Sequence, residues 1–290
     1  MKRDFCLGSE WLYYKIYTGV KTADTVLVEK LYPIISLLKE RKLISKWFFI
    51  RYKDSDEHLR IRFLIDSPNK LSETIMLLYP VLNKMLEQNI IWKIQTDTYK
   101  REIERYGQST MLDSEFLFWQ DSEMILQYLS IKPSFRNVDA QLLFSFCAIN
   151  NFLDSFLLTN TDKLKLMNDL QLSFKDEFNA NKILKKEMDK QYRELSHEIC
   201  QFLSGNAIND YPEVFKLIQE KQNQTKEAVL QIKENLQIPL SIFLMSHIHM
   251  IVNRQYTSKQ RMYELIIYDH LHRYYKTIEY RHSSLPKLKG

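Results

Sequence analysis

The run KWFFIRYKDSDEHLRIRFLID, from Lys46 to Asp66, decides the first part of the fold. Two stretches rich in aromatic and β-branched residues flank a polar turn at residues 53–57, which is the pattern of a β-hairpin. Side chains alternate across a strand, so His58, Arg60 and Arg62 share one face. The apolar side chains of the same strand occupy the other face, which we expect to pack against helices: Leu59, Ile61 and Phe63.

The hairpin lies among further strands and helices. Residues 11–18 are rich in aromatics and end at Gly19, which predicts a strand. Residues 22–42 and 68–89 have apolar residues at helical spacing, and residues 90–99 form a fourth expected strand. The first third therefore predicts a small antiparallel sheet packed by helices.

Beyond Ser109 the pattern changes to long helices. The expected helices cover residues 112–130, 139–158, 162–204, 211–236, 239–254 and 258–279. Pro239 suits an early helix position, and Ser258 could cap the last helix. The sequence thus predicts one α+β domain over residues 1–290, with a β-rich part at about 8–107 and a mostly helical part at about 108–282.

Composition is that of a globular protein and points to much helix. Of 290 residues, 45% are hydrophobic and 27% are charged, while only 5 are Gly and 7 are Pro. The first residues lack the apolar core of a signal peptide, and the longest apolar runs are too short to span a bilayer. We therefore expect a cytoplasmic protein.

Cysteine usage and charge exclude several other classes. Cys6, Cys147 and Cys200 are odd in number and far apart, which suggests neither a disulfide framework nor a zinc site. The net charge of +5 favours anionic partners only mildly, and it is typical of solvated Lys-rich helices. No glycine-rich phosphate loop, GxSxG, HExxH or dinucleotide fingerprint occurs, so we expect no cofactor.

The arginines of the hairpin strand form a candidate anion site. Arg60 and Arg62 repel each other unless an anion or solvent lies between them, and guanidinium groups suit carboxylate or phosphate. An exposed strand face with ordinary surface charges is the alternative. Alternation in the next strand would add one further polar face, in which Arg101 could converge with the first two: Lys93, Gln95, Asp97, Tyr99 and Arg101. Acidic neighbours such as Glu102 could balance this charge structurally.

A third candidate segment is SHIHMIVNR, from Ser246 to Arg254, in an otherwise apolar helix. His247 and His249 lie about 200° apart around a helix, so they cannot bind one metal ion together. Ser246, His249 and Asn253 fall within one turn of each other and form a polar patch. A core histidine is the alternative, but a neutral imidazole there would also suit proton transfer near neutral pH.

Four segments together resemble the elimination domain of lantibiotic dehydratases and its stand-alone relatives in thiopeptide pathways. They are GSEWLYYKIYTG, the hairpin WFFIRYKD…HLRIRF, TYKREIERYG and SHIHMIVNR. They occur from Gly8 to Arg254 in the order and spacing of that family, so the resemblance covers nearly the whole chain.

The resemblance implies a lyase in a two-step dehydration. A separate protein uses glutamyl-tRNA to esterify Ser or Thr of a ribosomal precursor peptide, and the elimination protein then expels glutamate to leave dehydroalanine or dehydrobutyrine. The catalytic residues that the resemblance implies are Arg60, Arg62, Arg101 and His249. Further side chains are assigned to substrate contact: Lys15, Arg51, His58, Tyr99, Asn253 and Arg254.

The expected partners follow from the same resemblance. They are the glutamylated precursor peptide and a tRNA-dependent glutamylating subunit, because the glutamylation domain is absent from this chain. A cyclase is a further candidate, relatives suggest a homodimer, and we expect no direct contact with nucleic acid. Alternatives are a pyridine-forming thiopeptide cyclase of the same fold and a non-catalytic scaffold that binds the precursor at a sheet edge.

Overall fold

The computed structural model describes residues 1–135, 137 and 139–284, without the side chains of 282–284. Two compact units divide this part of the chain. The first comprises residues 1–134 and 224–258, and the second comprises residues 135–223 and 259–290. All described strands belong to the first unit. The predicted α+β class, with a small antiparallel sheet before a mostly helical half, is confirmed.

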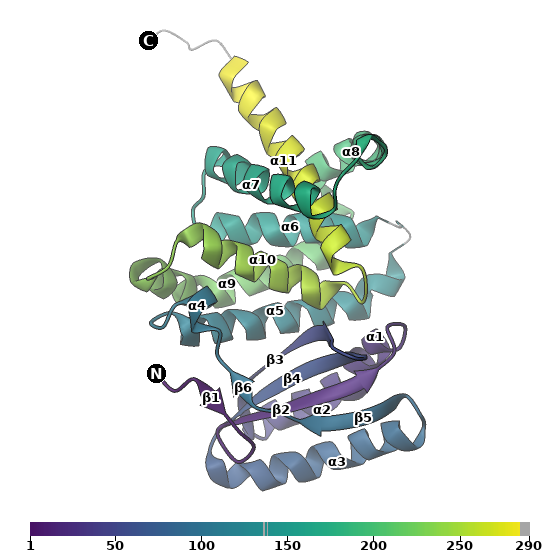
Figure 1. Cartoon of the computed structure of the whole chain (residues 1–290), viewed down its shortest axis with the longest axis vertical. Helices are drawn as coiled ribbons and strands as arrows, with labels where there is room; N and C mark the ends of the chain where they lie inside the picture. The colour runs from purple at the N-terminus through teal and green to yellow at the C-terminus, as the bar shows by residue number, and fades with distance from the viewer. Residues whose placement is uncertain (136, 138, 285–290) are drawn as a thin grey trace. The chain divides into compact units, whose positions relative to one another are not determined.

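The first unit contains a four-stranded antiparallel sheet in the order β3-β4-β2-β5. Its strands are β2 (Trp11–Thr18), β3 (Ile44–Lys53), β4 (Glu57–Ile65) and β5 (Ile91–Thr96). A continuous helical segment joins β2 to β3: α1 (Ala23–Thr25), the π-helix η1 (Val26–Leu31) and α2 (Tyr32–Glu40). The short η2 (Pro68–Lys70) and α3 (Leu71–Glu87) join β4 to β5. This is a βαββαβ arrangement, and Figure 1 shows α2 and α3 alongside the sheet.

The two faces of the sheet differ in chemistry. On one face the strands present an apolar layer that is almost fully buried: Leu12, Ile16, Trp47, Phe49, Leu59, Ile61 and Phe63. The helices α2 and α3 contact β3 and β5, respectively. On the opposite face β2 and β4 carry Lys15, Arg60 and Arg62, as the alternation in the hairpin predicts. We call this second face the basic face.

The fourth strand is shorter than expected, and this changes the placement of two candidate residues. β5 ends at Thr96, and Tyr99–Lys100 forms a separate strand, β6, that pairs with β1 (Asp4–Phe5). The single alternation predicted from Lys93 to Arg101 is therefore wrong. The chain turns at Asp97, whose side chain accepts a hydrogen bond from the Thr98 N–H (2.7 Å). The side-chain directions of Tyr99 and Arg101 are therefore set by pairing with the segment around β1, and not by β5.

Helices complete the first unit beside strand β3. They are α4 (Ile103–Tyr106), α5 (Met111–Ile131), η3 (Lys132–Ser134), α10 (Leu240–Gln255) and the end of α9 (Pro212–Asn235). Gly107 separates α4 from α5 at φ 78°, and a Cβ there would lie 2.6 Å from Thr110 Oγ1. Only glycine therefore fits this turn without displacing Thr110.

The second unit is helical in its described part. It contains α6 (Ala140–Ser155), α7 (Asn160–Glu177), α8 (Lys182–Leu203), η4 (Asn206–Asn209), the start of α9, and α11 (Gln260–Ser284). The single helix predicted over residues 162–204 is wrong, because Asn179 adopts φ 45° and breaks it into α7 and α8. α11 begins at Gln260, so Ser258 lies too early to be its cap. The single-domain assignment for residues 1–290 stays a prediction.

No helix in the described part of the chain is long and apolar enough to cross a membrane.

Candidate functional site

The register of the sheet builds a row of polar side chains on the basic face. Strand β2 pairs with β4 so that Tyr13 lies opposite Arg62, Lys15 opposite Arg60 and Tyr17 opposite His58. Directly opposite residues in an antiparallel pair have adjacent side chains. The aromatic and basic residues of two sequence segments therefore meet in one area.

Arg62 is the unusual member of this row. It is only 8% exposed, and its guanidinium carbon lies 4.4 Å from the ring centroid of Tyr13, 4.9 Å from that of Tyr99 and 5.2 Å from that of Phe48. Arg62 makes no hydrogen bond or ion pair with any residue that the structure describes, and its buried Nε has no acceptor there. Burial lowers the pKa of Arg62 from its ordinary value. A buried cation held only by aromatic rings is suited to receive an anion.

Arg60 is oriented by its strand neighbour His58. Its Nε donates a hydrogen bond to His58 Nε2 (3.2 Å), and its guanidinium carbon lies 3.4 Å from the centroid of the Tyr52 ring. The other ring nitrogen of His58 lies 3.0 Å from the Asp56 carbonyl oxygen. Both nitrogens of His58 are thus used within the protein, and we infer that this residue positions Arg60.

Lys15 has a carboxylate partner at the end of the neighbouring strand. Its Nζ lies 2.7 Å from Asp97 Oδ2, and this hydrogen bond raises the pKa of Lys15. Lys15 lies opposite Arg60 on one side and Gln95 on the other, whereas Tyr99 belongs to β6. Lys15 therefore contributes less uncompensated charge than Arg60 or Arg62.

Arg101 and Tyr99 meet at Glu115 on α5. Arg101 donates from Nε to Glu115 Oε1 (2.6 Å) and from Nη2 to Glu115 Oε2 (2.8 Å). The Tyr99 hydroxyl donates to the same Oε1 (2.9 Å). The Tyr99 ring also contacts Arg62, so one side chain touches both arginine sites.

Arg51, Asn253 and Arg254 close the β3 edge of the sheet. Asn253 Oδ1 accepts from the Arg51 N–H (3.0 Å), and its Nδ2 donates to the Arg51 carbonyl (2.8 Å). Arg254 Nε donates to the Phe49 carbonyl (2.9 Å), and Arg51 Nε donates to the Arg254 carbonyl (2.8 Å). Arg51 also binds Asp24 (2.6 Å). These polar groups satisfy an exposed strand edge, so their assignment to substrate contact stays a prediction.

The two histidines of α10 have different environments. His247 is fully buried among Tyr106, Phe118 and Phe243, with ring centroids 5.0, 5.2 and 4.4 Å away. His249 is half-buried and lies one turn before Asn253, on the helix side that reaches β3. Burial lowers the pKa of Arg254.

A model of the lantibiotic biosynthesis dehydratase C-terminal family matches residues 11–275. The chain belongs to this family. The nisin biosynthesis protein NisB of Lactococcus lactis subsp. lactis is 23% identical over 281 residues, covering 94% of this chain and 26% of that protein. The subtilin biosynthesis protein SpaB of Bacillus subtilis is 25% identical over 198 residues, covering 66% of this chain and 18% of that protein. The chain therefore spans about a quarter or less of these curated relatives.

Solved structures share the fold of this dehydratase-family chain. The tRNA-dependent lantibiotic dehydratase MibB from Microbispora sp. 107891 matches with a TM-score of 0.76 and 18% identity, over 97% of this chain and 29% of that one. The pyridine synthase TbtD from thiomuracin biosynthesis matches with a TM-score of 0.59 and 10% identity, over 93% of this chain and 100% of that one. At these identities the matches show the fold alone.

Glu115, Tyr13 and Phe48 are the neighbours of the arginines that sequence reasoning missed. Tyr13 could have been found, because the pairing of WLYYKIYT with HLRIRF places it opposite Arg62. Phe48 is its counterpart on β3, opposite Arg62 from the other side. Glu115 has only a weak signal, an acidic residue in the apolar helix MLDSEFLFW, and its pairing spans 14 residues through a turn.

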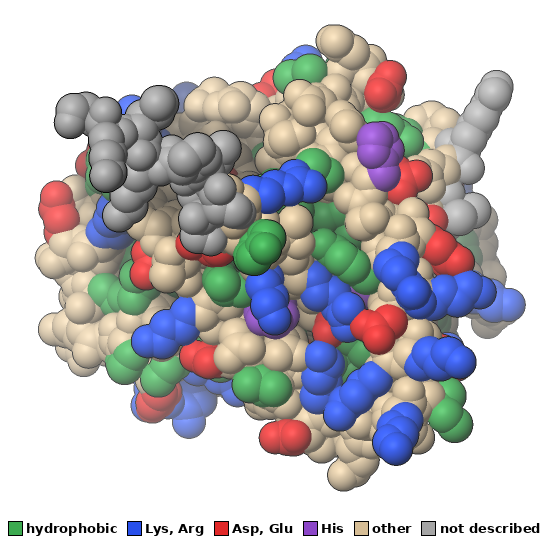
Figure 2. Space-filling view, turned by 90° about the horizontal axis from the view of Figure 1, so that it is seen from above, with side chains coloured by type: hydrophobic (Ala, Val, Ile, Leu, Met, Phe, Trp, Pro, Cys, Tyr) green, Lys and Arg blue, Asp and Glu red, His purple; other side chains and the backbone are tan. Residues whose placement is uncertain are grey.

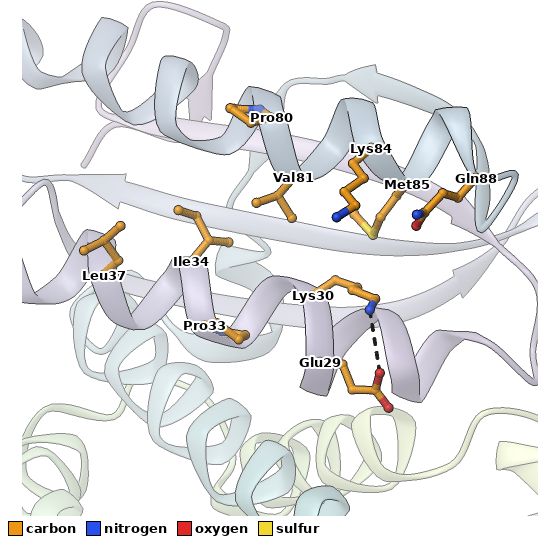
Figure 3. Close-up of a pocket in the computed structure, with 10 residues that line it drawn as sticks. All are labelled: Glu29, Lys30, Pro33, Ile34, Leu37, Pro80, Val81, Lys84, Met85 and Gln88. Atoms are coloured by element: carbon orange, nitrogen blue, oxygen red, sulfur yellow. Dashed lines mark ion pairs between the residues drawn. The ribbon is translucent and has the colours of Figure 1, made fainter.

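Among the cavities lined by described residues, one in each unit lies outside this dehydratase-family site. A cavity of about 510 Å³ between η1, α2 and α3 is lined mostly by apolar residues, including Pro33, Ile34, Val81 and Met85 (Figure 3). A groove of about 550 Å³ between α7 and α11 is lined by several polar side chains, with Lys175, Asp269 and Arg273 among them.

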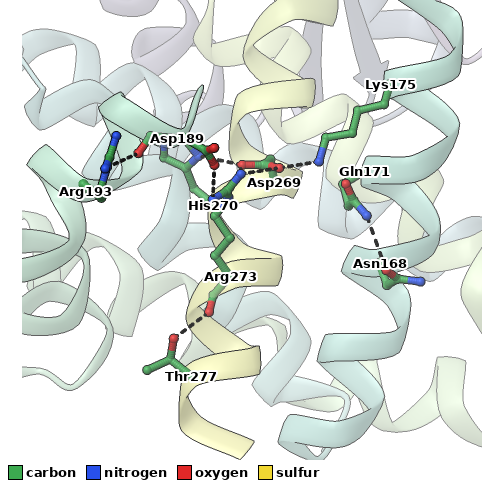
Figure 4. A network of polar contacts seen from close by, with 9 residues as sticks. All are labelled: Asn168, Gln171, Lys175, Asp189, Arg193, Asp269, His270, Arg273 and Thr277. Atoms are coloured by element: carbon green, nitrogen blue, oxygen red, sulfur yellow. Dashed lines mark hydrogen bonds and ion pairs between the residues drawn. The ribbon is translucent and has the colours of Figure 1, made fainter. Parts of the chain in front are cut away.

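The polar groove of the second unit is a closed ion-pair network (Figure 4). Asp269 accepts hydrogen bonds from Lys175 (2.6 Å) and Arg273 (2.6 Å), and Arg273 also pairs with Asp189 (2.5 Å). Burial alone would raise the pKa of Asp269, but hydrogen bonds from His270, Arg273 and Lys175 lower it well below its usual range. In this network the positive charges of Lys175 and Arg273 are matched by the carboxylates of Asp269 and Asp189, which is typical of a structural network. Figure 2 shows one face of the molecule, on which basic and acidic side chains are interspersed and several basic ones gather in one area.

Among the residues that the structure describes, no group of three or more His, Cys, Asp or Glu side chains is arranged to hold a metal ion. The only unpaired buried charge that the site offers for binding is the guanidinium of Arg62, within the described ranges. Such an unpaired guanidinium is chemically suited to an anion.

Proposed function

We propose that this chain catalyses the β-elimination of glutamate from glutamylated Ser or Thr of a ribosomal precursor peptide. The observation that carries the proposal is the guanidinium of Arg62. It is buried, it stands two residues from the half-buried Arg60 on the same strand face, and it has no carboxylate partner among the described residues. A departing carboxylate would supply the missing negative charge, and family membership supplies the dehydration context.

In this reaction a base removes the Cα proton of the glutamylated residue. The electron pair of the C–H bond forms the Cα=Cβ double bond, and the Cβ–O bond breaks. Its electrons leave with the glutamate carboxylate, and the product is dehydroalanine or dehydrobutyrine. Negative charge develops first at the peptide carbonyl and then on the leaving carboxylate, so preorganised cations near both atoms lower the barrier.

Arg62 and Arg60 are the proposed ligands of this developing charge. The guanidinium of Arg62 lies among buried aromatic rings, where an ion pair is stronger than in water. Arg60 stands two residues earlier on the same face and is more accessible. Together they could bind both oxygens of a carboxylate or one carboxylate and one enolate oxygen.

His249 is the proposed group for proton transfer, as base at Cα or as acid to the leaving oxygen. His249 is half-buried, so part of its side chain is accessible to solvent, whereas His247 is fully buried among aromatic rings. Removing a general acid or base typically costs about 10²–10⁴-fold in rate.

The proposed partners are those of a single step in a longer reaction. The substrate must arrive already glutamylated, so a tRNA-dependent glutamylating activity acts before this chain. The dehydroamino acid is electrophilic, so a cyclase could consume it. Homodimerisation, a cytoplasmic location and the absence of direct contact with nucleic acid remain part of the proposal.

The test is incubation with a preformed glutamylated Ser peptide, followed by mass spectrometry. We expect loss of glutamate from the peptide and its appearance in solution. His249→Gln should slow this release by about 10²–10⁴-fold. His272→Gln is the matched control, because His272 is also a half-buried helix histidine but belongs to α11.

Other outcomes of the same assay point to the rival functions. Expulsion of a leader peptide from a substrate with two dehydroamino acids would indicate a pyridine-forming cyclase. Peptide binding without any change of mass would indicate a scaffold. Normal release by His249→Gln would remove the proposed role of His249.

A further inference from the structure

Arg101 is not available to a substrate anion in the way that Arg62 is. Each of its three guanidinium nitrogens already donates to a protein acceptor. Nε and Nη2 bind Glu115, and Nη1 binds the Lys2 carbonyl (3.0 Å). Burial would lower the pKa of Arg101, but its hydrogen bond and charge interaction with Glu115 raise it. The expectation that Arg101 completes the anion site therefore needs another physical explanation.

Glu115 is the centre of this arrangement. It is fully buried, and its Oε1 accepts hydrogen bonds from both Arg101 Nε and the Tyr99 hydroxyl. A buried carboxylate with two cationic and one phenolic donor has a fixed orientation. Burial raises the pKa of Tyr99 well above its ordinary range, and the charge of Glu115 raises it further. The phenol therefore stays protonated and remains a donor to Glu115.

The ring of Tyr99 connects the fixed carboxylate of Glu115 to the guanidinium of Arg62. Three rings surround the Arg62 guanidinium, and Phe48 has no polar group by which it could be fixed. Tyr13 makes no hydrogen bond through its hydroxyl to any described residue. Tyr99 is the ring that a buried hydrogen bond holds in place. Because no hydrogen bond within the described chain orients Arg62 itself, the rings decide where its nitrogens point.

We propose that Glu115 is a positioning residue for the elimination reaction, which sets Arg62 through the ring of Tyr99, and that Arg101 acts as the counter-ion of Glu115. This inference rests on the proposed function. It assigns Arg101 to the support of the anion site, and it leaves Arg62 and Arg60 as the groups that touch the departing carboxylate.

The test is a double-mutant cycle between Glu115 and Arg62, which both contact Tyr99 and do not contact each other by any hydrogen bond or ion pair in the described chain. Glutamate release from preformed glutamylated peptide is measured for wild type, Glu115→Gln, Arg62→Lys and the double variant. We expect Glu115→Gln alone to lower kcat by about 10²-fold, the usual cost of misplacing a reacting group by about 1 Å. In the Glu115→Gln background, Arg62→Lys should cost less than about 3-fold, because Arg62 is already misplaced.

Glu123→Gln is the control for a loss of stability alone. Glu123 also lies on α5, is nearly buried and accepts hydrogen bonds from Trp47 (2.9 Å) and Trp119 (3.0 Å), away from Arg62. Its combination with Arg62→Lys should be additive, with the full effect of Arg62→Lys retained. Additive behaviour of Glu115→Gln and Arg62→Lys would overturn the proposal.

Tyr99→Phe provides a second route if Glu115→Gln fails to fold. It removes the hydroxyl and keeps the Arg101–Glu115 ion pair. We expect it to lower kcat by at least about 10-fold, consistent with the loss of one hydrogen bond to a charged carboxylate, and to shift the Nε–H resonance of Arg62 in spectra of 15N-arginine-labelled protein. The resonance is assigned by its absence in Arg62→Lys. An unchanged resonance in Tyr99→Phe would contradict the positioning role.

The same spectrum separates this inference from the proposed function. If the wild type releases no glutamate, the proposed elimination fails, and the Arg62 resonance still reports whether Tyr99 orients Arg62. If release occurs and the cycle is additive, the elimination stands and the role of Glu115 falls.

Discussion

Two arginines of the first unit are equally buried but have opposite surroundings. Arg62 is 8% exposed and Arg101 is 7% exposed. Arg101 makes two short hydrogen bonds to the carboxylate of Glu115, whereas Arg62 has aromatic rings around it and no ion pair in the described chain. Burial alone therefore does not distinguish a structural arginine from one that is held ready for a ligand.

The two sites differ in whether the buried guanidinium has a counter-ion. Burying a cation without a counter-ion opposes folding, whereas a well-hydrogen-bonded pair offsets much of that cost. The aromatic contacts of Arg62 compensate only in part. A fold that keeps such a group gives up stability at that position, as binding and catalytic sites commonly do. Arg101 follows the opposite pattern, because its partner is built into α5.

The largest expected effect is a difference in stability between the same substitution at the two sites. Arg101→Met leaves Glu115 buried without its counter-ion and should lower the free energy of unfolding by about 3–5 kcal/mol. Arg62→Met removes an unpaired charge and should leave that free energy unchanged or raise it. Urea denaturation of both variants measures the comparison. Equal destabilisation would mean that Arg62 has a structural role like that of Arg101.

Arg62 should matter little for stability but strongly for catalysis, even when the substitution is conservative. Arg62→Lys keeps the charge but loses the planar fork that binds a carboxylate through two parallel hydrogen bonds. We expect kcat for glutamate release to fall by about 10²–10³-fold, as when one donor to a developing anion is removed. The fold should remain intact by circular dichroism. Activity within 3-fold of wild type would show that Arg62 supplies charge only.

Binding of a simple carboxylate at Arg62 should change the free energy of unfolding by a smaller amount. Propionate at ten times its dissociation constant should stabilise the wild type by about 1.4 kcal/mol, because it binds the folded state. Thermal unfolding measures this, with sodium chloride at matched ionic strength to correct for screening. The neutral isostere propionamide should have no effect, and neither compound should stabilise Arg62→Met. Stabilisation of Arg62→Met by propionate would place the anion site elsewhere.

The sequence predicted the elements that depend on local pattern. The hairpin and the shared face of His58, Arg60 and Arg62 follow from strand alternation, and the structure has both. It also predicted most helix boundaries, because their apolar spacing is regular. The break at Asn179 was missed because a single residue in the left-handed conformation leaves no trace in that spacing.

The candidate site depended on contacts that local pattern does not encode. Alternation was extended from Lys93 through Arg101, but β5 ends at Thr96, and Tyr99 pairs with Phe5 instead. The choice of Glu115 as the partner of Arg101 depends on how α5 packs, which only the folded chain defines. Arg51, Asn253 and Arg254 were predicted to contact substrate, whereas their hydrogen bonds in the structure close a strand edge.

The smallest expected effect concerns His58, whose ring is the hydrogen-bond partner of the half-buried Arg60. Burial lowers the pKa of His58, so the neutral ring accepts the hydrogen bond from Arg60 Nε. Between its lowered pKa and the ordinary value of about 6.5, the unfolded chain binds a proton that the folded chain does not. The free energy of unfolding should therefore fall as the pH decreases below about 6.5. It is fully restored above that pH.

His58→Gln isolates this effect from the other histidines whose pKa burial lowers, His270 and His272. The glutamine oxygen can still accept from Arg60 but does not titrate in this range. Urea denaturation at pH 7.5 and pH 5.5 should show a smaller loss for His58→Gln than for the wild type. Equal losses would mean that the folded His58 takes up a proton as readily as the unfolded chain. In that event His58⁺ would repel Arg60, and the basic face would depend on Arg62 alone for its fixed charge.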